Sequence, residues 1–235
     1  MGRPIDLAAM DAELIDCRAC PRLVEWREKV AVEKRAAFRD ETYWGRPVPG
    51  FGPPDAAVLI VGLAPAAHGA NRTGRMFTGD RSGDFLYAAM HAVGLANQPT
   101  ATSIDDGLEL RGTRITSPVH CAPPANKPTT AERDNCRHWL DTELELLKPT
   151  LRSVVVLGGF GWQALLPVLD DHGWTIPKPR PKFGHGVRVS LDGDRPLSLL
   201  GCYHVSQQNT FTRRLTPAML ESVLTEAARA AGVLS

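Results

Sequence analysis

Four of the five cysteines stand in two pairs that suit a metal centre. Two residues separate Cys17 from Cys20, which is a chelating spacing, and Cys121 and Cys136 form the second pair. Four thiolates match a tetrahedral zinc ion or an iron–sulfur cluster, and the spacing does not separate the two. Four buried free thiols are the plainer alternative. Cys202 falls in an apolar stretch and is expected to be a core residue.

A second group of candidate residues lies in the segment 62–80, directly after the apolar run 57–61. The first ten residues of this segment contain no carboxylate, and His68 is their one ionisable side chain. The segment ends in the carboxylate of Asp80, and a further polar run begins at His204. Histidine and carboxylate side chains transfer protons and stabilise charge, so both segments are candidates for a catalytic site.

Strand and helix patterns alternate along the chain and predict the elements that hold these residues. Apolar runs indicate buried strands at 57–61, 114–119, 153–157, 187–191 and 197–203. Helical spacing and capping residues indicate helices at 6–15, 21–38, 84–93, 129–147, 161–169 and 217–231. This order predicts one domain spanning 1–235, an α/β three-layer α/β/α sandwich with a central, mainly parallel sheet. Ligands bind beyond the carboxyl ends of such strands, so the segments at 62–80 and 204–210 are expected to share one crevice.

Composition narrows the class of protein. The formal net charge is +1, so any contact with nucleic acid must come from a local basic patch. No apolar run approaches the roughly 20 residues that span a membrane, and acidic residues interrupt the N-terminal segment where a signal peptide needs an apolar core. With an odd number of cysteines, these features predict a cytoplasmic protein without a disulfide framework.

Three motifs occur together: GLAPA with TGRMFTGD within 62–80, CAPPANKP at 121–128, and HVSQQNT at 204–210. Their combination resembles the uracil-DNA glycosylase superfamily, and more narrowly family 5, the type B enzymes of bacteria and archaea. The resemblance implies a 4Fe–4S cluster held by Cys17, Cys20, Cys121 and Cys136. It also implies a monofunctional enzyme that flips uracil out of double-stranded DNA and hydrolyses its N-glycosidic bond, leaving an abasic site.

Within this resemblance the expected catalytic residues are Asp80, Asn126 and His204. His204 is expected to donate to the uracil carbonyl as negative charge develops on the leaving base. Asp80 is expected to stabilise the sugar cation and orient water, and Asn126 to help hold that water. Asp84 is the rival carboxylate, although its place in the first turn of a predicted helix has a structural explanation.

A further set of residues is expected to contact the base and the DNA. Phe77 is the candidate stacking surface for the flipped base, with ordinary core packing as the alternative. The backbone of Gly62, Leu63 and Ala64 is expected to approach the base, and His68 to add a hydrogen bond. The expected DNA contacts are Arg72, Arg75, Gln207, Gln208, Asn209, Arg213 and Arg214. The three consecutive amides among them are candidates to fill the gap left by the flipped nucleotide.

The chain departs from the family pattern at two places. It has HVS at 204–206 where the family often has His-Pro-Ser, so the fixed backbone angle of proline is missing. It also has TSP at 116–118 where some relatives carry a base-recognising asparagine, which predicts a broader pocket that admits hypoxanthine or other deaminated bases. The alternative class is a redox-sensing iron–sulfur protein that binds DNA without chemistry. We expect a monomer.

Overall fold

The computed structural model describes residues 6–234, and its centre is a five-stranded sheet with strand order β2-β1-β3-β5-β4. The four parallel strands are β1 (Val58–Val61), β2 (Thr113–Thr116), β3 (Ser153–Leu157) and β5 (Leu197–Cys202). β4 (Arg188–Leu191) pairs antiparallel with β5 at one edge. Every residue of β1 and β3 is buried, as expected for parallel strands covered on both faces. The predicted mainly parallel α/β fold is confirmed.

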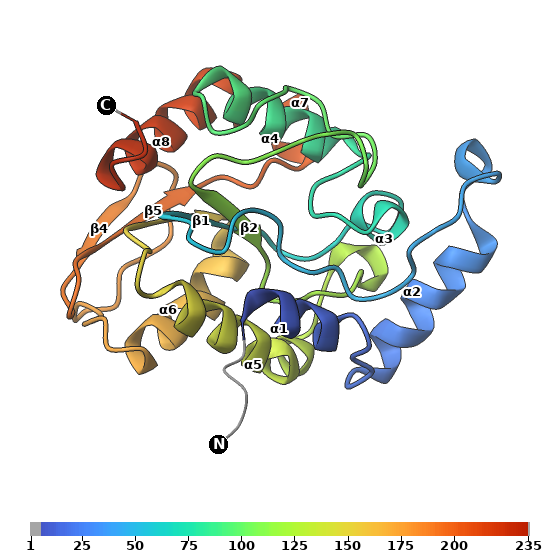
Figure 1. Ribbon diagram of the computed structural model, residues 1–235, viewed down its shortest axis with the longest axis horizontal. Helices are drawn as coiled ribbons and strands as arrows, with labels where there is room; N and C mark the ends of the chain where they lie inside the picture. The colour runs from blue at the N-terminus through green and yellow to red at the C-terminus, as the bar shows by residue number, and fades with distance from the viewer. Residues whose placement is uncertain (1–5, 235) are drawn as a thin grey trace.

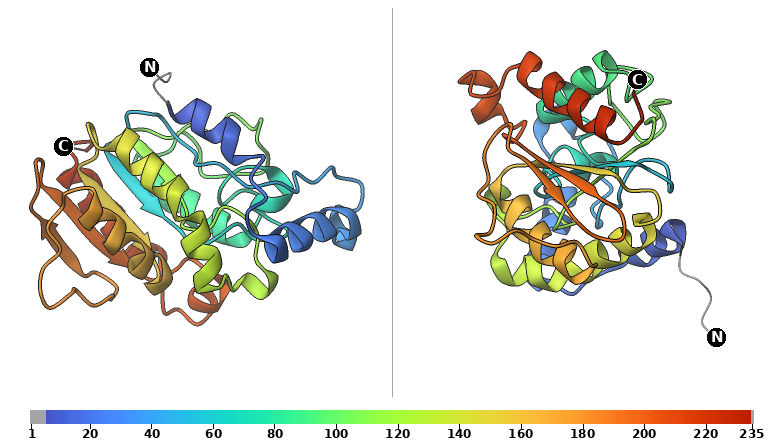
Figure 2. Two further views of the ribbon diagram at one scale, coloured as in Figure 1. Left: turned by 90° about the horizontal axis from the view of Figure 1, so that it is seen from below. Right: turned by 90° about the vertical axis from the view of Figure 1, so that its left-hand side faces the viewer.

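Helices cover both faces of the sheet (Figures 1 and 2). One face carries α4 (Arg81–Ala92) and α8 (Pro217–Ala230); the other carries α1 (Leu7–Leu14), α5 (Thr130–Leu147) and α6 (Gly159–Asp171). Because successive strand residues point to opposite faces, Ile60 packs in the core beneath α4 and α8, whereas Leu59 and Val61 pack against α5 and α6. The expected three layers result from this alternation.

Helix α2 (Pro21–Glu33) extends to one side of the sheet and leads into the short η1 (Ala36–Phe38) (Figure 1). The helix predicted at 21–38 is interrupted because Lys34 has a φ of 53°, which is outside the right-handed helical region. Three further short helices lie in segments expected to be loops: α3 (Ala70–Thr73), η2 (Pro124–Asn126) and α7 (Gln207–Phe211). They are too short for helical periodicity to reveal them.

The register of the sheet brings the candidate segments to one edge. Val61 pairs with Val156, and Leu157 pairs with Cys202, so the parallel strands end at a common level. The chain that leaves these strands includes the expected segments 62–80 and 204–210. Between residues 6 and 234, no helix combines the length and the apolar character needed to cross a membrane.

Candidate active site and cysteine centre

A cavity of about 460 Å³ opens at the carboxyl edge of the sheet. The segments that follow β1, β2, β3 and β5 contribute Leu63, Ser117, Gly158 and His204 to its wall. The cavity is lined by these residues from the expected site: Leu63, Ala64, Phe77, Asp80, Asn126, His204, Gln208, Asn209 and Arg214. The two segments that were expected to share a crevice therefore meet in the folded chain.

Phe77 occupies the cavity wall in a strained backbone conformation. Its φ is 52°, which is rare for a bulky residue, and its ring centroid lies 6.2 Å from that of His204. Two glycines make room for it: a Cβ at Gly62 would lie 3.0 Å from the Phe77 ring, and one at Gly83 would lie 1.7 Å from its carbonyl oxygen. Gly62 therefore serves the site by admitting the aromatic ring.

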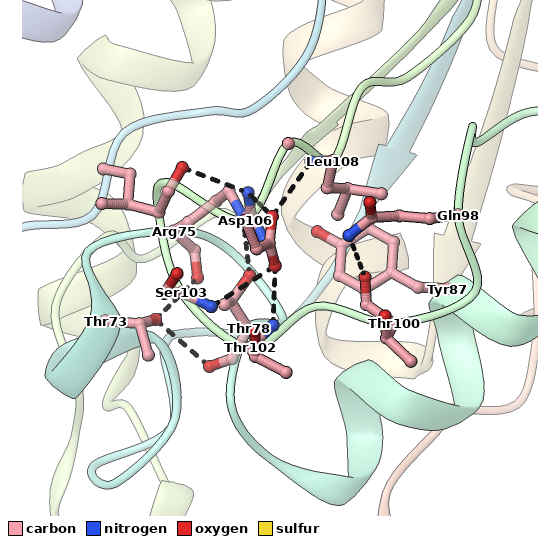
Figure 3. A network of polar contacts seen from close by, with 12 residues as sticks. Thr73, Arg75, Thr78, Tyr87, Gln98, Thr100, Thr102, Ser103, Asp106 and Leu108 are labelled. Atoms are coloured by element: carbon pink, nitrogen blue, oxygen red, sulfur yellow. Dashed lines mark hydrogen bonds and ion pairs between the residues drawn. The ribbon is translucent and has the colours of Figure 1, made fainter.

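A buried polar network fixes the backbone on both sides of Phe77 (Figure 3). Arg75 donates from Nη1 and Nη2 to the two carboxylate oxygens of Asp106 at 2.9 and 2.7 Å. Its Nε donates to the hydroxyl of Thr78 at 2.9 Å, and the hydroxyl of Tyr87 donates to the carbonyl oxygen of Met76 at 2.7 Å. Arg75 and Thr78 bracket the strained residue, so this network holds the ring in place.

Arg72 and Arg75 were expected to bind DNA phosphates, but the structure places both guanidinium groups in internal contacts. Arg75 is only 4% exposed and is held by Asp106. Arg72 is 8% exposed, forms an ion pair with Glu41, and donates to the carbonyl oxygen of Gly79 at 2.8 Å. These contacts engage both guanidinium groups inside the protein, so both arginines stabilise the 62–80 segment, and their proposed contacts with DNA stay a prediction.

Asp80 lies where the cavity meets a second groove of about 640 Å³. Its Oδ1 accepts a hydrogen bond from the backbone N–H of Gly83 at 2.9 Å, so Asp80 is also the N-cap of α4. This cap explains why α4 begins three residues before the predicted start at Asp84. Gly69 leaves space for Oδ2, because a Cβ there would lie 2.0 Å from that oxygen. Burial raises the pKa of the Asp80 carboxyl.

The rival carboxylate, Asp84, is exposed and borders the second groove but is absent from the cavity wall. It lies in the first turn of α4, where the helix dipole stabilises a negative charge. The structure therefore brings Asp80, and not Asp84, to the cavity that Phe77 and His204 share.

His204 is neutral at neutral pH, because burial lowers its pKa to about 4. The side-chain amide of Asn209 donates to the carbonyl oxygen of His204 at 2.8 Å, which ties α7 to this loop. Val205, at the position where the family resemblance implied a proline, is fully buried in the core that α4 and α8 cover. Packing of Val205 thus anchors the loop where the fixed angle of proline is missing.

His68 and Asn126 were both expected at the site, but only Asn126 borders the cavity. His68 lies in the second groove, outside the cavity, with its Nδ1 3.1 Å from the Tyr43 hydroxyl, and burial lowers its pKa. Asn126 borders both the cavity and the groove. Ala125 and Asn126 have φ values of 53° and 55°, so the tip of this loop is strained. Strain of this kind concentrates at functional sites.

Helix α7 presents an exposed aromatic residue that the sequence analysis overlooked. Phe211 is 64% exposed, and the guanidinium of Arg81 lies 5.3 Å from the centre of its ring. An isolated phenylalanine in the otherwise polar run 206–214 was the feature that pointed to it. Nearby, Arg213 and Arg214 are exposed, and the Arg214 guanidinium covers the Tyr203 ring at 4.5 Å.

The four paired cysteines come from the turn between α1 and α2, the segment after β2, and α5. These cysteines lie near enough to one another that a negative charge on Cys17 or Cys20 would disfavour ionisation of Cys121 and Cys136. Burial raises the pKa of the Cys121 thiol to about 11 and also raises that of Cys136. Between residues 6 and 234, no three cysteine, histidine or carboxylate side chains are gathered as ligands of one metal ion.

An apolar contact joins the cavity to the cysteine centre, which consists of Cys17, Cys20, Cys121 and Cys136. Leu23, Val119 and Cys121 form a small buried cluster, against which Ala64 and Phe160 pack. Ala64 and Phe160 also line the cavity. The cluster around Cys121 and the cavity therefore share Ala64 and Phe160 as a common wall.

The fold and this cavity define an α/β enzyme that handles a flat ring, since an aromatic surface, a neutral imidazole and a carboxylate border one space. Residues 49–228 match the family model of the uracil DNA glycosylase superfamily. The chain therefore belongs to this superfamily, and the predicted family and class of enzyme, a DNA N-glycosylase, are confirmed.

Its relatives narrow the group to the type-5 enzymes. The chain is 56% identical over 227 residues to the type-5 uracil-DNA glycosylase of Mycobacterium bovis, an alignment covering 97% of this chain and 82% of that protein. Identity to the type-5 enzyme of Thermus thermophilus is 50% over 229 residues, covering 97% of this chain and all of that protein. For the type-5 enzyme of Pyrobaculum aerophilum it is 48% over 221 residues, covering 94% and 92%.

Proposed function

We propose that this enzyme flips uracil out of double-stranded DNA into the cavity and hydrolyses the N-glycosidic bond, leaving an abasic site. The observation that carries this proposal is the convergence of Phe77, Asp80 and His204 on one cavity at the carboxyl edge of the sheet. A flipped base needs a flat surface on which to stack, and the ring of Phe77 provides one.

Breaking the bond creates two opposite charges, and the cavity has a group suited to each. The sugar develops the character of an oxocarbenium ion, which the Asp80 carboxylate stabilises while it orients water with Asn126. The departing uracil gains negative charge, and the neutral imidazole of His204 donates an N–H to its carbonyl oxygen. Because His204 is already neutral, it acts as a hydrogen-bond donor and not as a cation.

We propose a substrate range wider than uracil. A cavity of about 460 Å³ has room for a base larger than a pyrimidine. The stretch 116–118, the region where the family resemblance implies a base-recognising asparagine in some relatives, contributes Ser117 to the wall. The Ser117 hydroxyl donates to the carbonyl oxygen of Val119 at 2.9 Å. Its hydrogen is therefore not directed at the base. The site has a less selective base-reading group here, which favours hypoxanthine and other deaminated bases as further substrates.

The proposed DNA surface consists of α7 and the residues that follow it. Arg213 and Arg214 are exposed beside the cavity and suit contacts with phosphates. Gln207 and Gln208 are exposed on α7 and remain candidates to fill the gap in the duplex. Phe211 joins them as the apolar member, since apolar side chains are the usual wedges between base steps. Asn209 has a separate role, because its amide holds the His204 backbone.

We also propose that Cys17, Cys20, Cys121 and Cys136 hold a 4Fe–4S cluster. When bound, such a cluster cross-links the three protein segments that carry these four cysteines through iron–thiolate bonds. A single zinc ion needs its ligands about 2.3 Å away on all sides, whereas four irons hold their thiolates farther apart. The buried side chain of Arg27 fits this group, because it donates from Nη1 to the Cys121 sulfur at 2.9 Å.

We place the enzyme in the cytoplasm as a monomer, with residues 1–235 forming one domain. Two buried cores on the two faces of a single sheet support one folding unit. Arg214 lines the cavity, and the exposed Arg213 directly precedes it. One protomer therefore carries the whole proposed site.

Incubation of purified protein with duplexes that differ at one base tests the proposed activity. Matched duplexes contain uracil, hypoxanthine or an undamaged base, and abasic sites are measured by cleavage of the strand in alkali. We expect abasic sites in the uracil duplex, fewer in the hypoxanthine duplex and none in the control. Binding without base release would support the DNA-binding redox sensor instead.

A further inference from the structure

A buried arginine lies beside the cysteine centre without a carboxylate partner. Arg27, on α2, is only 2% exposed. Its Nη1 donates to the Cys121 sulfur at 2.9 Å, and its Nη2 donates to the carbonyl oxygen of Cys17 at 3.1 Å. Its Nε is buried and has no hydrogen-bond partner in the described part of the chain. None of these partners is a carboxylate.

A buried guanidinium needs an anion, because removing an unpaired charge from water costs several kcal/mol or more. The other buried arginines of this protein obey that rule. Arg75 pairs with Asp106, and Arg114 pairs with Asp11 and Glu143. For Arg27 the contacting group able to carry negative charge is the Cys121 sulfur, and a neutral thiol supplies none. Glu28 also senses the charge of Arg27, but its carboxylate is exposed and paired with Arg18. A cluster with four thiolate ligands has a net negative charge.

We propose that Arg27 is the buried counter-charge of the iron–sulfur cluster and holds it in the protein. This proposal rests on the proposed cluster. Hydrogen bonds and nearby charge at the sulfurs set how firmly a cluster is held and how readily it accepts an electron. Arg27 supplies both through one guanidinium directed at Cys121, so it acts as a positioning residue for the cluster.

The position of Arg27 also couples the cluster to the catalytic segment. The fully buried Asn71 donates from its side-chain amide to the carbonyl oxygen of Arg27 at 3.2 Å. Its backbone N–H donates to the carbonyl oxygen of Ala66 at 3.0 Å, and Ala66 lines the cavity. A displacement of Arg27 therefore reaches the cavity wall through a single intervening residue.

The test compares Arg27→Lys, which keeps the charge, with Arg27→Gln, which removes it. Anaerobically purified proteins are assayed for iron per chain and for the rate at which a chelator bleaches the visible absorption. We expect Arg27→Gln to lose the cluster about tenfold faster than wild type, the usual effect of removing a group that supports a metal ligand. Arg27→Lys should lie near wild type. The reduction potential of any cluster kept by Arg27→Gln should be more negative, because a nearby positive charge is gone.

Arg18→Gln is the matched control, because Arg18 follows Cys17 directly but is 62% exposed and pairs with Glu28. It should match wild type in every measurement. Equal behaviour of the Lys and Gln variants, whether both keep iron or both lose it, overturns the proposal, since charge would then not be what matters. Wild-type protein that binds no iron would instead refute the cluster itself.

Discussion

The cysteine centre and the cavity share one apolar contact, but they differ in backbone conformation. None of the four paired cysteines has a left-handed backbone angle, and the buried charge of Arg27 is directed at a sulfur. Around the cavity, the lining residues Phe77 and Asn126 have left-handed backbone angles, and so do Ala125 and Arg213, each next to a lining residue. The first region is organised for stability, whereas the second stores strain that the surrounding network must hold in place.

This difference implies that substitutions in the two regions should affect different properties of the enzyme. A change in the cysteine centre should reduce both stability and activity, because the cavity wall rests on it through Ala64 and Phe160. A change at a cavity side chain should reduce the rate of base release while leaving the fold intact. Four predictions test this contrast, ordered by the size of the expected effect.

Cys121→Ser should abolish the cluster and lower the melting temperature. Iron should fall from about four per chain, the content of one 4Fe–4S cluster, to a small residue, since serine does not replace a thiolate ligand. Cys202→Ala is the control: Cys202 is buried in the core on the α8 face of β5, away from the paired cysteines, so iron should be retained. Iron analysis with thermal unfolding decides this, and wild-type iron in Cys121→Ser would refute the proposed ligand set.

Asp80→Asn should slow single-turnover release of uracil by about 10²- to 10³-fold, as expected when charge stabilisation in the transition state is lost. Asparagine caps a helix as well as aspartate, so α4 and the fold should be preserved. Binding to a duplex with an abasic site should therefore remain near the wild-type level. Asp84→Asn serves as the control and should be nearly silent. The reverse result, with Asp84→Asn inactive and Asp80→Asn intact, would show that the wrong carboxylate was chosen.

The single-turnover rate should stay constant as pH falls through 6.5, the ordinary pKa of histidine. The reason is that the half-buried His204 becomes protonated only near its pKa of about 4. The rate should fall only in more acidic solution, where Asp80, with its raised pKa, also takes up a proton. Melting temperatures over the same range separate a loss of rate from unfolding. A midpoint near 6.5 that disappears in His204→Gln would contradict the neutral imidazole.

Phe211→Ala should weaken binding to a duplex with an abasic site by roughly tenfold, which corresponds to about 1.4 kcal/mol. Binding to an undamaged duplex should change less, because a wedge is needed only where a nucleotide is flipped or missing. The double variant Gln207→Ala/Gln208→Ala provides the comparison on the same helix. Fluorescence anisotropy with both duplexes measures the effect. An equal loss on both duplexes would show that α7 only contacts the backbone of the DNA.

The sequence alone predicted those elements and motifs whose interactions join residues close together in the chain. The strand at 153–157 was predicted with its observed bounds because a continuous apolar run needs no distant partner to be recognised. The capping box of Thr129 and Glu132 forms as expected, because its two hydrogen bonds join residues three apart. The motifs that indicated the family are equally local, as each lies in one short segment that leaves a strand.

The tertiary structure alone decided which polar side chains are free to act. Arg72 and Arg75 resemble surface arginines in the sequence, but their partners Glu41 and Asp106 are each 31 residues away along the chain. The neutral state of His204 follows from burial by segments remote in sequence, and the exposure of Phe211 from the way α7 leaves the sheet. Burial and long-range ion pairs depend on which segments the fold brings together, and local sequence patterns do not reveal that arrangement.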